Sequence, residues 1–463
     1  MVRNFLLLIV FLSFSSCDPT SEEMTRRQNV LFIAVDDLND WIGALNGHSQ
    51  VKTPNIDKLA SRGILFTNAH TAAPACNPSR VALLTGLCPT TSGIYLNPQP
   101  WRPVLPDVVT IPKYFQSNGY ISLGAGKIFH GAFPDPGAWD DYYPSKTQTR
   151  PADPKPENVP VNGIPDTQHF DWGPLNVNDD QMGDTKVADW VIKQLQRHHE
   201  KPFFLAAGIF RPHLPWYVPQ KYFDSYPLEE IQLPPFLESD LEDIPPPGIA
   251  MAKPMGDHKN IIKYNQWKEA VQGYLASIEF ADIQIGRIID VLNQSHYREN
   301  TIIVLWSDHG WHLGEKSHWR KFALWERSTR VTFMIVAPNI AKPGRSSRPV
   351  NLIDIYPTLI DLTGLPEKND LDGLSLRSLL ETPNAHWPRP SITTHGRGNH
   401  AVRDDRWRYI RYVDGSEELY DLENDKNEWM NLASDSTYFE IKSKLIDWLP
   451  KTEAASAPLL ENR

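Results

Sequence analysis

Two uninterrupted apolar segments, far apart in the chain, limit the folds that this sequence can adopt. Residues 29–35 read Asn-Val-Leu-Phe-Ile-Ala-Val, and residues 301–306 read Thr-Ile-Ile-Val-Leu-Trp. Neither segment alternates apolar with polar residues, and both are rich in β-branched side chains. This pattern is typical of strands buried on both faces of a parallel sheet. The sequence therefore predicts an α/β fold in which helices cover both faces of a mostly parallel sheet.

Segments with helical periodicity lie between and after these two strands. Apolar residues at amphipathic spacing predict helices at 53–62, 104–118, 267–294 and 351–363. Each of these segments is followed by a glycine or by a predicted strand. A further strand is predicted at 120–123. Two proline-rich segments, 131–180 and 233–259, interrupt this alternation. We expect them to be long loops that shape a site.

Beyond Pro388 the pattern changes to short strands separated by polar turns. Strands are predicted at 391–394, 400–403, 407–413 and 418–422, followed by a closing helix at 438–448. We therefore expect a large domain at 29–385 and a small antiparallel α+β subdomain at 386–463.

The N-terminus resembles an export signal. Arg3 precedes an apolar run, 5–12, that is too short to span a bilayer as a mature helix. Small residues then lead to Cys17, as in a bacterial lipobox, although Phe14 replaces the usual leucine. We expect a signal peptide at 1–17, a linker at 18–28, and an exported protein in the periplasm or on the outer-membrane surface, held to the membrane only by lipid on Cys17. An ordinary signal peptide and a soluble export product are the alternative.

The charge balance of the chain limits its partners. The formal net charge is -10 over 463 residues, which argues against a general nucleic-acid binder. An anionic substrate would need a local pocket of lysine, arginine and histidine.

Both predicted buried strands end in acidic residues. Asp36 and Asp37 follow the first strand, and Asp308 and His309 follow the second after one serine. Ligand sites in open α/β sheets lie beyond the carboxyl ends of the strands, so these residues are expected to converge. Carboxylate oxygens suit Ca²⁺ or Mg²⁺, although imidazole is an unusual ligand for calcium. Two unrelated turn acids remain the simpler alternative for either strand alone.

One cysteine lies in a helix-start pattern. Cys76-Asn77-Pro78-Ser79-Arg80 opens a predicted helix that ends at Gly86, and proline suits the first helical turn. A reactive group there would face unpaired N–H donors that favour an anion, and Arg80 adds a positive fork for oxyanions. A buried structural cysteine is the alternative. Cys88 could pair with Cys76 in an oxidising compartment, but a plain apolar role for Cys88 is favoured.

This pentapeptide, followed by Leu84-Thr85-Gly86, resembles the signature of type I sulfatases. The resemblance implies an alkaline-phosphatase-like fold and conversion of Cys76 by a maturation enzyme to formylglycine (3-oxoalanine), whose hydrate attacks sulfate esters. The acidic pairs resemble the iduronate-2-sulfatase-like branch, which implies one calcium held by Asp36, Asp37, Cys76, Asp308 and His309. Zinc is the competing metal, as in phosphatases of the same superfamily.

Three further segments resemble sulfatase motifs and carry the remaining catalytic candidates. Lys127 and His130 lie in Gly-Lys-Ile-Phe-His, His213 in Arg-Pro-His-Leu-Pro, and Lys321 ends the segment that starts at Gly314. The resemblance implies that Arg80, Lys127 and Lys321 neutralise the sulfate oxygens. It also implies that His213 protonates the leaving group and that His130 acts as the later base. Lys316 and Arg320 are expected to be surface charges.

The substrate is the least determined feature. The resemblance implies a sulfated carbohydrate, either an algal polysaccharide such as ulvan or a uronate 2-O-sulfate oligosaccharide. Aromatic side chains near these motifs and basic side chains in a glycine-rich turn are candidates for contact with sugar. They are Trp139, Trp216, His395, Arg397 and His400. The alternatives are a phosphatase or phosphonate hydrolase of the same superfamily, and a non-catalytic protein that binds sulfated glycans.

Overall fold

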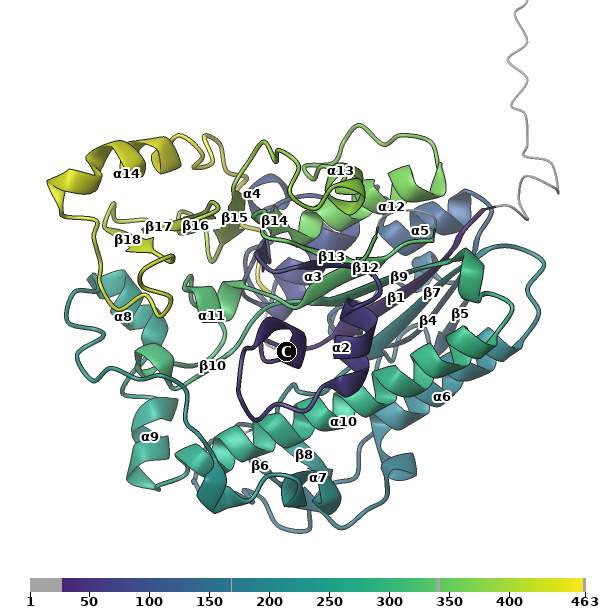
Figure 1. The fold of residues 1–463 in the computed structure, drawn as a ribbon, viewed down its shortest axis with the longest axis horizontal. Coiled ribbons are helices and arrows are strands. Elements are labelled where there is room, and N and C mark those ends of the chain that lie inside the picture. The colour runs from purple at the N-terminus through teal and green to yellow at the C-terminus, as the bar shows by residue number, and fades with distance from the viewer. Residues whose placement is uncertain (1–26, 168, 339–341, 461–463) are drawn as a thin grey trace, which may run out of the picture.

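The computed structural model describes residues 27–460 except 168 and 339–341, and its centre is an eight-stranded sheet (Figure 1). The strand order is β13-β2-β12-β9-β1-β7-β4-β5. The strands from β9 to β5 are parallel, whereas β12 runs antiparallel to both of its neighbours. Their bounds are β1 Asn29–Val35, β2 Ile64–Phe66, β4 Ile121–Gly126, β5 Asp141–Tyr143, β7 Phe203–Ile209, β9 Thr301–Ser307, β12 Phe333–Val336 and β13 Gly344–Ser346.

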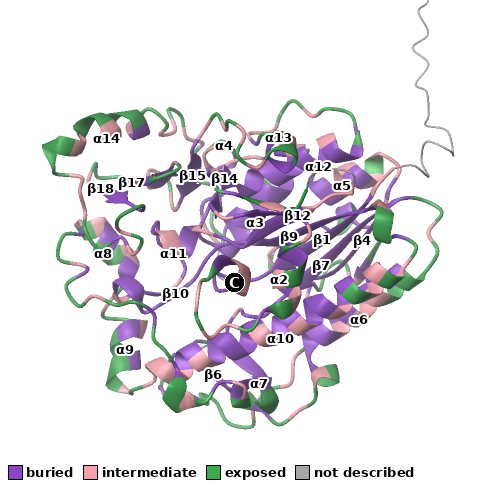
Figure 2. Ribbon diagram, in the orientation of Figure 1, coloured by how far each residue is buried: buried purple, intermediate pink, exposed green. Residues whose placement is uncertain are grey.

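Helices cover both faces of this sheet, as the unbroken apolar strands predict (Figure 1). Alternate residues of β1 point to opposite faces and join two separate cores. Leu31 and Ile33 pack with α2, α6 and α10, whereas Val30 and Phe32 pack with α3, α5 and α12. The helices are α2 Pro54–Ala60, α3 Cys76–Thr85, α5 Ile111–Ser117, α6 Gly183–Gln196, α10 Trp267–Gln294 and α12 Ile355–Thr363. Figure 2 shows the central strands buried throughout.

The long loops are only partly irregular. The first contains β6 (Trp172–Leu175), and the second contains α8 (Pro246–Ala252) and the start of α9 (Asp257–Lys263). Between the two loops lie β8 (Trp216–Pro219), which pairs with β6 in parallel, and α7 (Gln220–Asp224). Smaller elements are β3 Ala69–His70, α4 Pro89–Ser92, β10 His312–Leu313, β11 Trp319–Arg320, α11 Glu326–Thr329, β14 Val350–Asn351 and α13 Arg377–Glu381.

The C-terminal part is the antiparallel sheet that the short strand pattern predicts. It comprises β15 (Ser391–Thr394), β16 (His400–Arg403), β17 (Trp407–Arg411) and β18 (Glu417–Asp421), in sequence order. Helix α14 (Phe439–Ile446) packs on one face of this sheet through Leu445. The other face packs against Leu324 and Trp325 of the large domain.

The residues that follow α14 run back along the large domain. The N–H of Ala454 donates to the carbonyl of Thr90 at 2.7 Å, and the N–H of Ala457 donates to that of Gly93 at 2.9 Å. The side chain of Gln99 donates to the carbonyl of Ala457 at 2.6 Å. The carbonyl of Gln99 in turn accepts from the side chain of Asn77, at the start of α3. The last described residues therefore support the beginning of that helix.

The predicted signal peptide, including Cys17, lies outside the described residues, as does most of the predicted linker. Within the described part of the chain, no helix combines the length and the apolar character needed to cross a bilayer.

Candidate active site

The carboxyl ends of β1 and β9 place four side chains with metal-ligating atoms at one edge of the sheet. Asp36 and Asp37 follow β1, and Asp308 and His309 follow β9, which is its parallel neighbour. The backbone N–H of Asp37 donates to a carboxylate oxygen of Asp308 at 3.1 Å. All four residues are completely buried. The two acidic strand ends therefore converge, as the sequence predicts.

Cys76 is the first residue of α3 and lies against this acidic cluster. Its Sγ is 2.9 Å from Nζ of Lys321 and 3.4 Å from Nε2 of His309. Oδ1 of Asp37 is 4.0 Å away. The helix ends at Gly86 in the left-handed conformation that glycine favours, with φ of 75°. The predicted helix, with its cysteine at the positive end, is therefore present.

Arg80 lies one helical turn after Cys76 and is completely buried. Its Nε donates to Asp308 at 2.8 Å and its Nη2 donates to Asp36 at 3.0 Å. Its Nη1 donates to the backbone carbonyls of Lys127 and Ile128. Four of its five N–H groups are thus used within the protein. Arg80 fixes two carboxylates of the cluster, and its contact with sulfate oxygens stays a prediction.

Two lysines from different segments enter the same cluster. Lys127 follows β4 and forms an ion pair with Asp36. Lys321 follows β11 and its Nζ lies 2.7 Å from Oδ1 of Asp37. Both lysine side chains are more than nine-tenths buried. Lys127 and Lys321 therefore bring two buried cations to the cluster, each paired with one of its carboxylates.

Two histidines lie beside these lysines. Nε2 of His213 is 3.8 Å from Oδ2 of Asp37, and Nδ1 of His213 is 2.7 Å from the carbonyl of Leu214, so Nδ1 carries the hydrogen. Burial and the charge of Lys127 hold the pKa of His213 well below its usual range. The same two causes lower the pKa of His130 to about 3. Both imidazoles are therefore neutral at neutral pH.

The carboxyl groups of the cluster differ in their protonation. Burial alone would raise the pKa of Asp36, but the charges of Lys127, Arg80 and Lys321 hold it well below its usual range. Burial raises the pKa of Asp37 to about 7, and the neighbouring Asp36 and Cys76 act in the same direction. Oδ2 of Asp37 is buried and has no hydrogen-bond partner among the residues that the structure describes. Further positive charge at this point would stabilise the ionised carboxylate.

The donor set fits a bound cation. Single ligand atoms of Asp36, Cys76, Asp308 and His309 all lie within 4.8 Å of one another. Nδ1 of His309 is 3.0 Å from the carbonyl of Gly310, which leaves the lone pair of Nε2 directed at the cluster. A histidine fixed in this way is prepared to bind metal. Asp37 would raise the number of carboxylates beside this set to three, and carboxylate oxygens favour a hard cation.

Comparison with known proteins gives this geometry its context. The sulfatase family model matches residues 28–365, and a model described as N-sulphoglucosamine sulphohydrolase, C-terminal, matches residues 314–455. The chain belongs to the sulfatase family. It is therefore a sulfuric ester hydrolase, in a family that generally uses a formylglycine and a metal ion.

Two curated relatives show where in the family this sulfatase lies. It is 41% identical to a sulfatase of Formosa agariphila over 98% of this chain and 92% of that protein. It is 32% identical to human iduronate 2-sulfatase over 73% of this chain and 69% of that protein. The predicted likeness to iduronate-2-sulfatase and bacterial sulfatases is confirmed.

Solved structures confirm the predicted alkaline-phosphatase-like sulfatase fold. One is a protein in complex with its substrate D-glucosamine-2-N,6-O-disulfate, at a TM-score of 0.74 and 20% identity, covering 91% of this chain and 96% of that one. Another is a phosphonate monoester hydrolase from Silicibacter pomeroyi, at a TM-score of 0.76 and 21% identity, covering 91% and 94%. At these identities the likeness concerns the fold.

Three of the candidate sugar contacts of this sulfatase are wrong because the side chains are buried. Trp139 packs among core aromatics, and Trp216 is completely buried with its indole N–H donated to the carbonyl of Pro212. His400 is 4% exposed, and its ring nitrogens contact Thr394 and Glu453. These three residues stabilise the fold.

The other two candidates lie on the turn between β15 and β16. Arg397 is exposed and donates to the carbonyl of Glu453. The ring of His395 is 5.9 Å from that of Phe322, the residue after Lys321, and its Nδ1 is buried without a partner. His395 therefore remains a candidate for a substrate contact, whereas nothing in its contacts brings Arg397 to the site.

Several supporting residues were missed by sequence reasoning. The hydroxyl of Tyr274 in α10 donates to the carbonyl of Asp37 at 2.7 Å, and Oγ of Ser307 accepts from the N–H of Leu38 at 3.0 Å. Lys316, expected at the surface, is 2% exposed and pairs with Asp240 at 2.8 Å. Each contact joins segments far apart in the sequence, so no local pattern could have indicated it.

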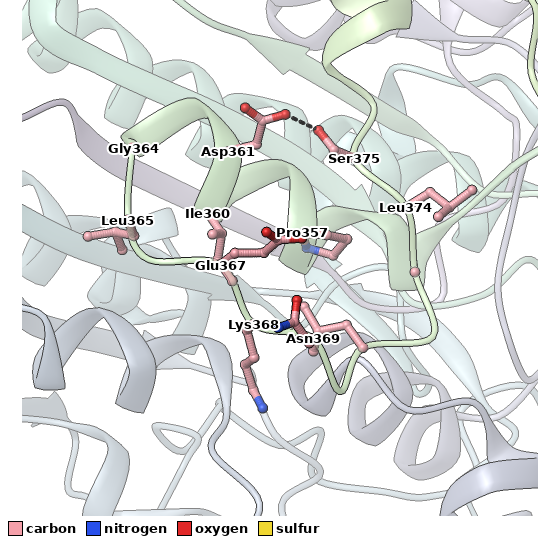
Figure 3. Close-up of a pocket in the computed structure, with 12 residues that line it drawn as sticks. Pro357, Ile360, Asp361, Gly364, Leu365, Glu367, Lys368, Asn369, Leu374 and Ser375 are labelled. Atoms are coloured by element: carbon pink, nitrogen blue, oxygen red, sulfur yellow. Dashed lines mark hydrogen bonds between the residues drawn. The ribbon is translucent and has the colours of Figure 1, made fainter.

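A separate hollow of about 600 Å³ lies beside α12 (Figure 3). Its lining includes Asp361, Glu367 and Lys368, and Asp361 is hydrogen-bonded to Ser375. It contains none of the residues gathered around Cys76. The chemistry of this sulfatase therefore lies elsewhere, at the carboxyl edge of the sheet.

Proposed function

We propose that this sulfatase hydrolyses sulfate esters of a sulfated carbohydrate, using a formylglycine at position 76 and one bound calcium ion. The single observation that carries the proposal is the position of Cys76, at the start of α3 and in contact with both Lys321 and His309. The name of one relative, human iduronate 2-sulfatase, supports a sugar substrate. A uronate 2-O-sulfate oligosaccharide or an algal polysaccharide such as ulvan fits this proposal.

Asp36, Asp37, Asp308 and His309 would hold the calcium, with the modified residue 76 as a further ligand. When bound, calcium would neutralise negative charge on the sulfate oxygens. The oxidised and hydrated side chain at position 76 would supply a hydroxyl as the nucleophile. In the present chain, Sγ of Cys76 stands in for that oxygen.

The cationic side chains of this chain then have distinct tasks. Lys127 and Lys321 lie within the cluster and would contact the sulfate oxygens, which is the usual way to stabilise charge in such a reaction. Arg80 keeps Asp36 and Asp308 in position. Neutral His130 can accept a proton from the side chain at position 76.

His213 would protonate the leaving sugar oxygen. Its Nδ1 hydrogen is used by the carbonyl of Leu214, so only the imidazolium can donate from Nε2. A bound sulfate favours that imidazolium, because an opposite charge nearby raises the pKa of a histidine. Proton donation matters most when the leaving group is a poor one.

Replacing His213 should therefore harm one class of substrate more than another. We expect His213→Gln to lower kcat/KM for a sugar sulfate by about 10²- to 10⁴-fold, the usual contribution of a general acid. An aryl sulfate whose phenol leaves readily should lose less than about tenfold. The measurement is sulfate release by wild type and variant from both substrates. Equal losses on both would remove His213 from the role of acid.

The proposed function is tested with matured protein and a panel of esters. Free sulfate is assayed from ulvan, heparin, chondroitin and carrageenan oligosaccharides, alongside phosphate and phosphonate esters, with calcium or zinc supplied. We expect release from one of the sulfated saccharides with calcium. Faster turnover of phosphorus esters with zinc would favour the phosphatase alternative, and no turnover together with unmodified Cys76 would favour a glycan-binding protein.

Export and lipid attachment are also proposed, from the sequence of residues 1–17. Mass analysis of the same purified protein, made in a bacterial host with a lipoprotein pathway, tests both processing events. We expect an N-terminal peptide that starts at diacylated Cys17, and a peptide carrying formylglycine at position 76. An unlipidated mature N-terminus would contradict the anchor without affecting the enzyme.

A further inference from the structure

Arg320 is not the plain surface charge that its sequence suggests. It is the residue before Lys321 and lies at the end of β11, with a backbone φ of 76°. A residue with a side chain has an unfavourable backbone energy in this left-handed region, by about 1–2 kcal/mol. Phe322, on the other side of Lys321, has φ of 75°. Such conformations persist where the surrounding structure holds them, and they cluster at functional sites.

One edge of the Arg320 guanidinium is fixed by an acid. Its Nε is 2.6 Å from Oδ2 of Asp257, at the start of α9, and its Nη2 is 3.3 Å from Oδ1 of the same carboxylate. The guanidinium also lies over the ring of Phe170, 4.6 Å from the centroid. Two contacts from different segments therefore orient a side chain that is only 22% exposed.

The other edge of the guanidinium faces His169. Nη1 of Arg320 has one hydrogen-bond contact among the described residues, to Nε2 of His169 at 3.4 Å. Since Arg can only donate, Nε2 of His169 accepts and its Nδ1 carries the hydrogen. The ring of His169 stacks on that of His213 at 6.4 Å, and Nε2 of His213 lies 3.8 Å from Asp37. His213 and His169 thus lie in series between the acidic cluster and Arg320.

The chemistry of this outer pair differs from that of the inner cluster. Arg80, Lys127 and Lys321 are buried and paired with the carboxylates of the cluster. His169 is exposed, and the free N–H groups of Arg320 face no carboxylate among the described residues. A planar guanidinium with a free edge matches a carboxylate or sulfate group. A saccharide whose scissile sulfate reaches the cluster would carry its neighbouring substituents past His213 towards this pair.

We propose that Arg320 and His169 form a second anion-binding position, which recognises an additional oxyanion on the saccharide whose sulfate is removed. The oxyanion is a carboxylate of a uronate or a second sulfate. This inference rests on the proposed function, because it assumes a sulfated carbohydrate at the inner cluster. Arg320 makes the contact and Asp257 positions it. The pair therefore determines specificity and leaves the chemical step unchanged.

The test uses Arg320→Gln, which removes the charge but keeps hydrogen-bonding groups. Its matched control is Arg287→Gln, which removes a partly exposed arginine paired with Asp189 on the outer helices α10 and α6. Turnover of an aryl sulfate without a second anion is measured first. Both variants should keep kcat/KM for it within about threefold of wild type, since the lost contact is worth little to such a substrate.

Three disaccharides are then compared as competitive inhibitors of that turnover. The first is a uronate disaccharide with one sulfate, and the second is its carboxyl-reduced counterpart. The third carries two sulfates and has no carboxylate. The uronate disaccharide and the disulfated disaccharide each carry two anionic groups, whereas the carboxyl-reduced one carries one. We expect wild type and Arg287→Gln to bind at least one of the two doubly anionic ligands at least about tenfold more tightly than the carboxyl-reduced one. A charged hydrogen bond has an effect of this size. Arg320→Gln should lose that preference, and the ligand concerned identifies the oxyanion.

The outcomes separate this inference from the proposed function. If wild type shows no preference for a second anion, or if Arg320→Gln keeps the preference, the second position does not exist. An equal loss of aryl sulfate turnover and of inhibitor binding would mean that Arg320 only supports the fold near Lys321. Absence of sulfate release by matured wild type from the aryl sulfate and from every sulfated saccharide of the panel would instead contradict the proposed function itself.

Discussion

Replacing Cys76 by serine is expected to reduce sulfate release by at least about 10³-fold, the scale seen when a nucleophile is removed. Serine keeps the position at the start of α3 and adds a hydroxyl, but it cannot carry the two hydroxyls of an aldehyde hydrate. Any nucleophilic attack by serine would therefore leave the sulfate attached to the protein. The measurement is sulfate release over several turnovers, together with the intact mass of the variant after exposure to substrate.

The control for this prediction is Cys88→Ser. Cys88 is a free cysteine in contact with Ala72, Ala82 and Ile353, and burial raises the pKa of its thiol beyond the normal range. We expect this variant to keep most of its activity and to lose a modest amount of stability, about 1 kcal/mol for a polar substitution in a small apolar contact. Full activity of Cys76→Ser, or of wild type shown by mass to carry unmodified Cys76, would remove residue 76 from the reaction.

Removal of the metal is expected to have the second largest effect. Treatment with a calcium chelator should lower kcat/KM by at least about 10²-fold, because a cation that neutralises the substrate contributes several kcal/mol. Calcium, but not zinc, should restore activity. The melting temperature should fall as well, because three buried carboxylates then share only the charges of Arg80, Lys127 and Lys321.

The pH dependence of calcium binding follows from Asp37. In the metal-free protein its pKa is raised to about 7, mainly by burial. A carboxyl must lose its proton to bind calcium, so affinity should be constant above pH 7 and fall by up to about tenfold per pH unit below it. Calorimetric titration between pH 5 and 8 measures this trend. Asp37→Asn should abolish it, whereas Asp405→Asn, at a surface ion pair with Arg348, should not.

The long amphipathic helix α10 and the four C-terminal strands were predicted almost to the residue, because strong local periodicity and turn residues determine them. The start of α5 was not. The helix begins at Ile111, with Pro112 in its first turn, whereas helical periodicity extended the prediction back to residue 104. Residues 101–107 instead form turns. The side chain of Arg102 donates to the backbone carbonyls of Leu105, Pro106 and Val108.

In the candidate site, too, some features follow from local sequence and others depend on residues that are distant in the chain. Motifs and strand ends indicated which residues gather around Cys76. They could not show that the Arg80 guanidinium is used by Asp36 and Asp308, because that depends on three segments meeting. Burial of Trp139 and Trp216 also depends on tertiary packing, since an aromatic residue in a loop looks alike in sequence whether it contacts sugar or core. Motifs could not place Arg320 beside His169 either, because that contact joins the loop at 131–180 to β11.

The path of the last described residues has a consequence for biosynthesis. Ala454 and Ala457 support the loop that holds Asn77, next to Cys76. This support is made only after residue 457 has been synthesised. At about 5–20 residues per second, Cys76 leaves the ribosome on the order of 20 to 80 seconds before its surroundings can be completed. The proposed maturation enzyme would have access to the thiol during that interval, whereas in the folded chain Cys76 is 2% exposed.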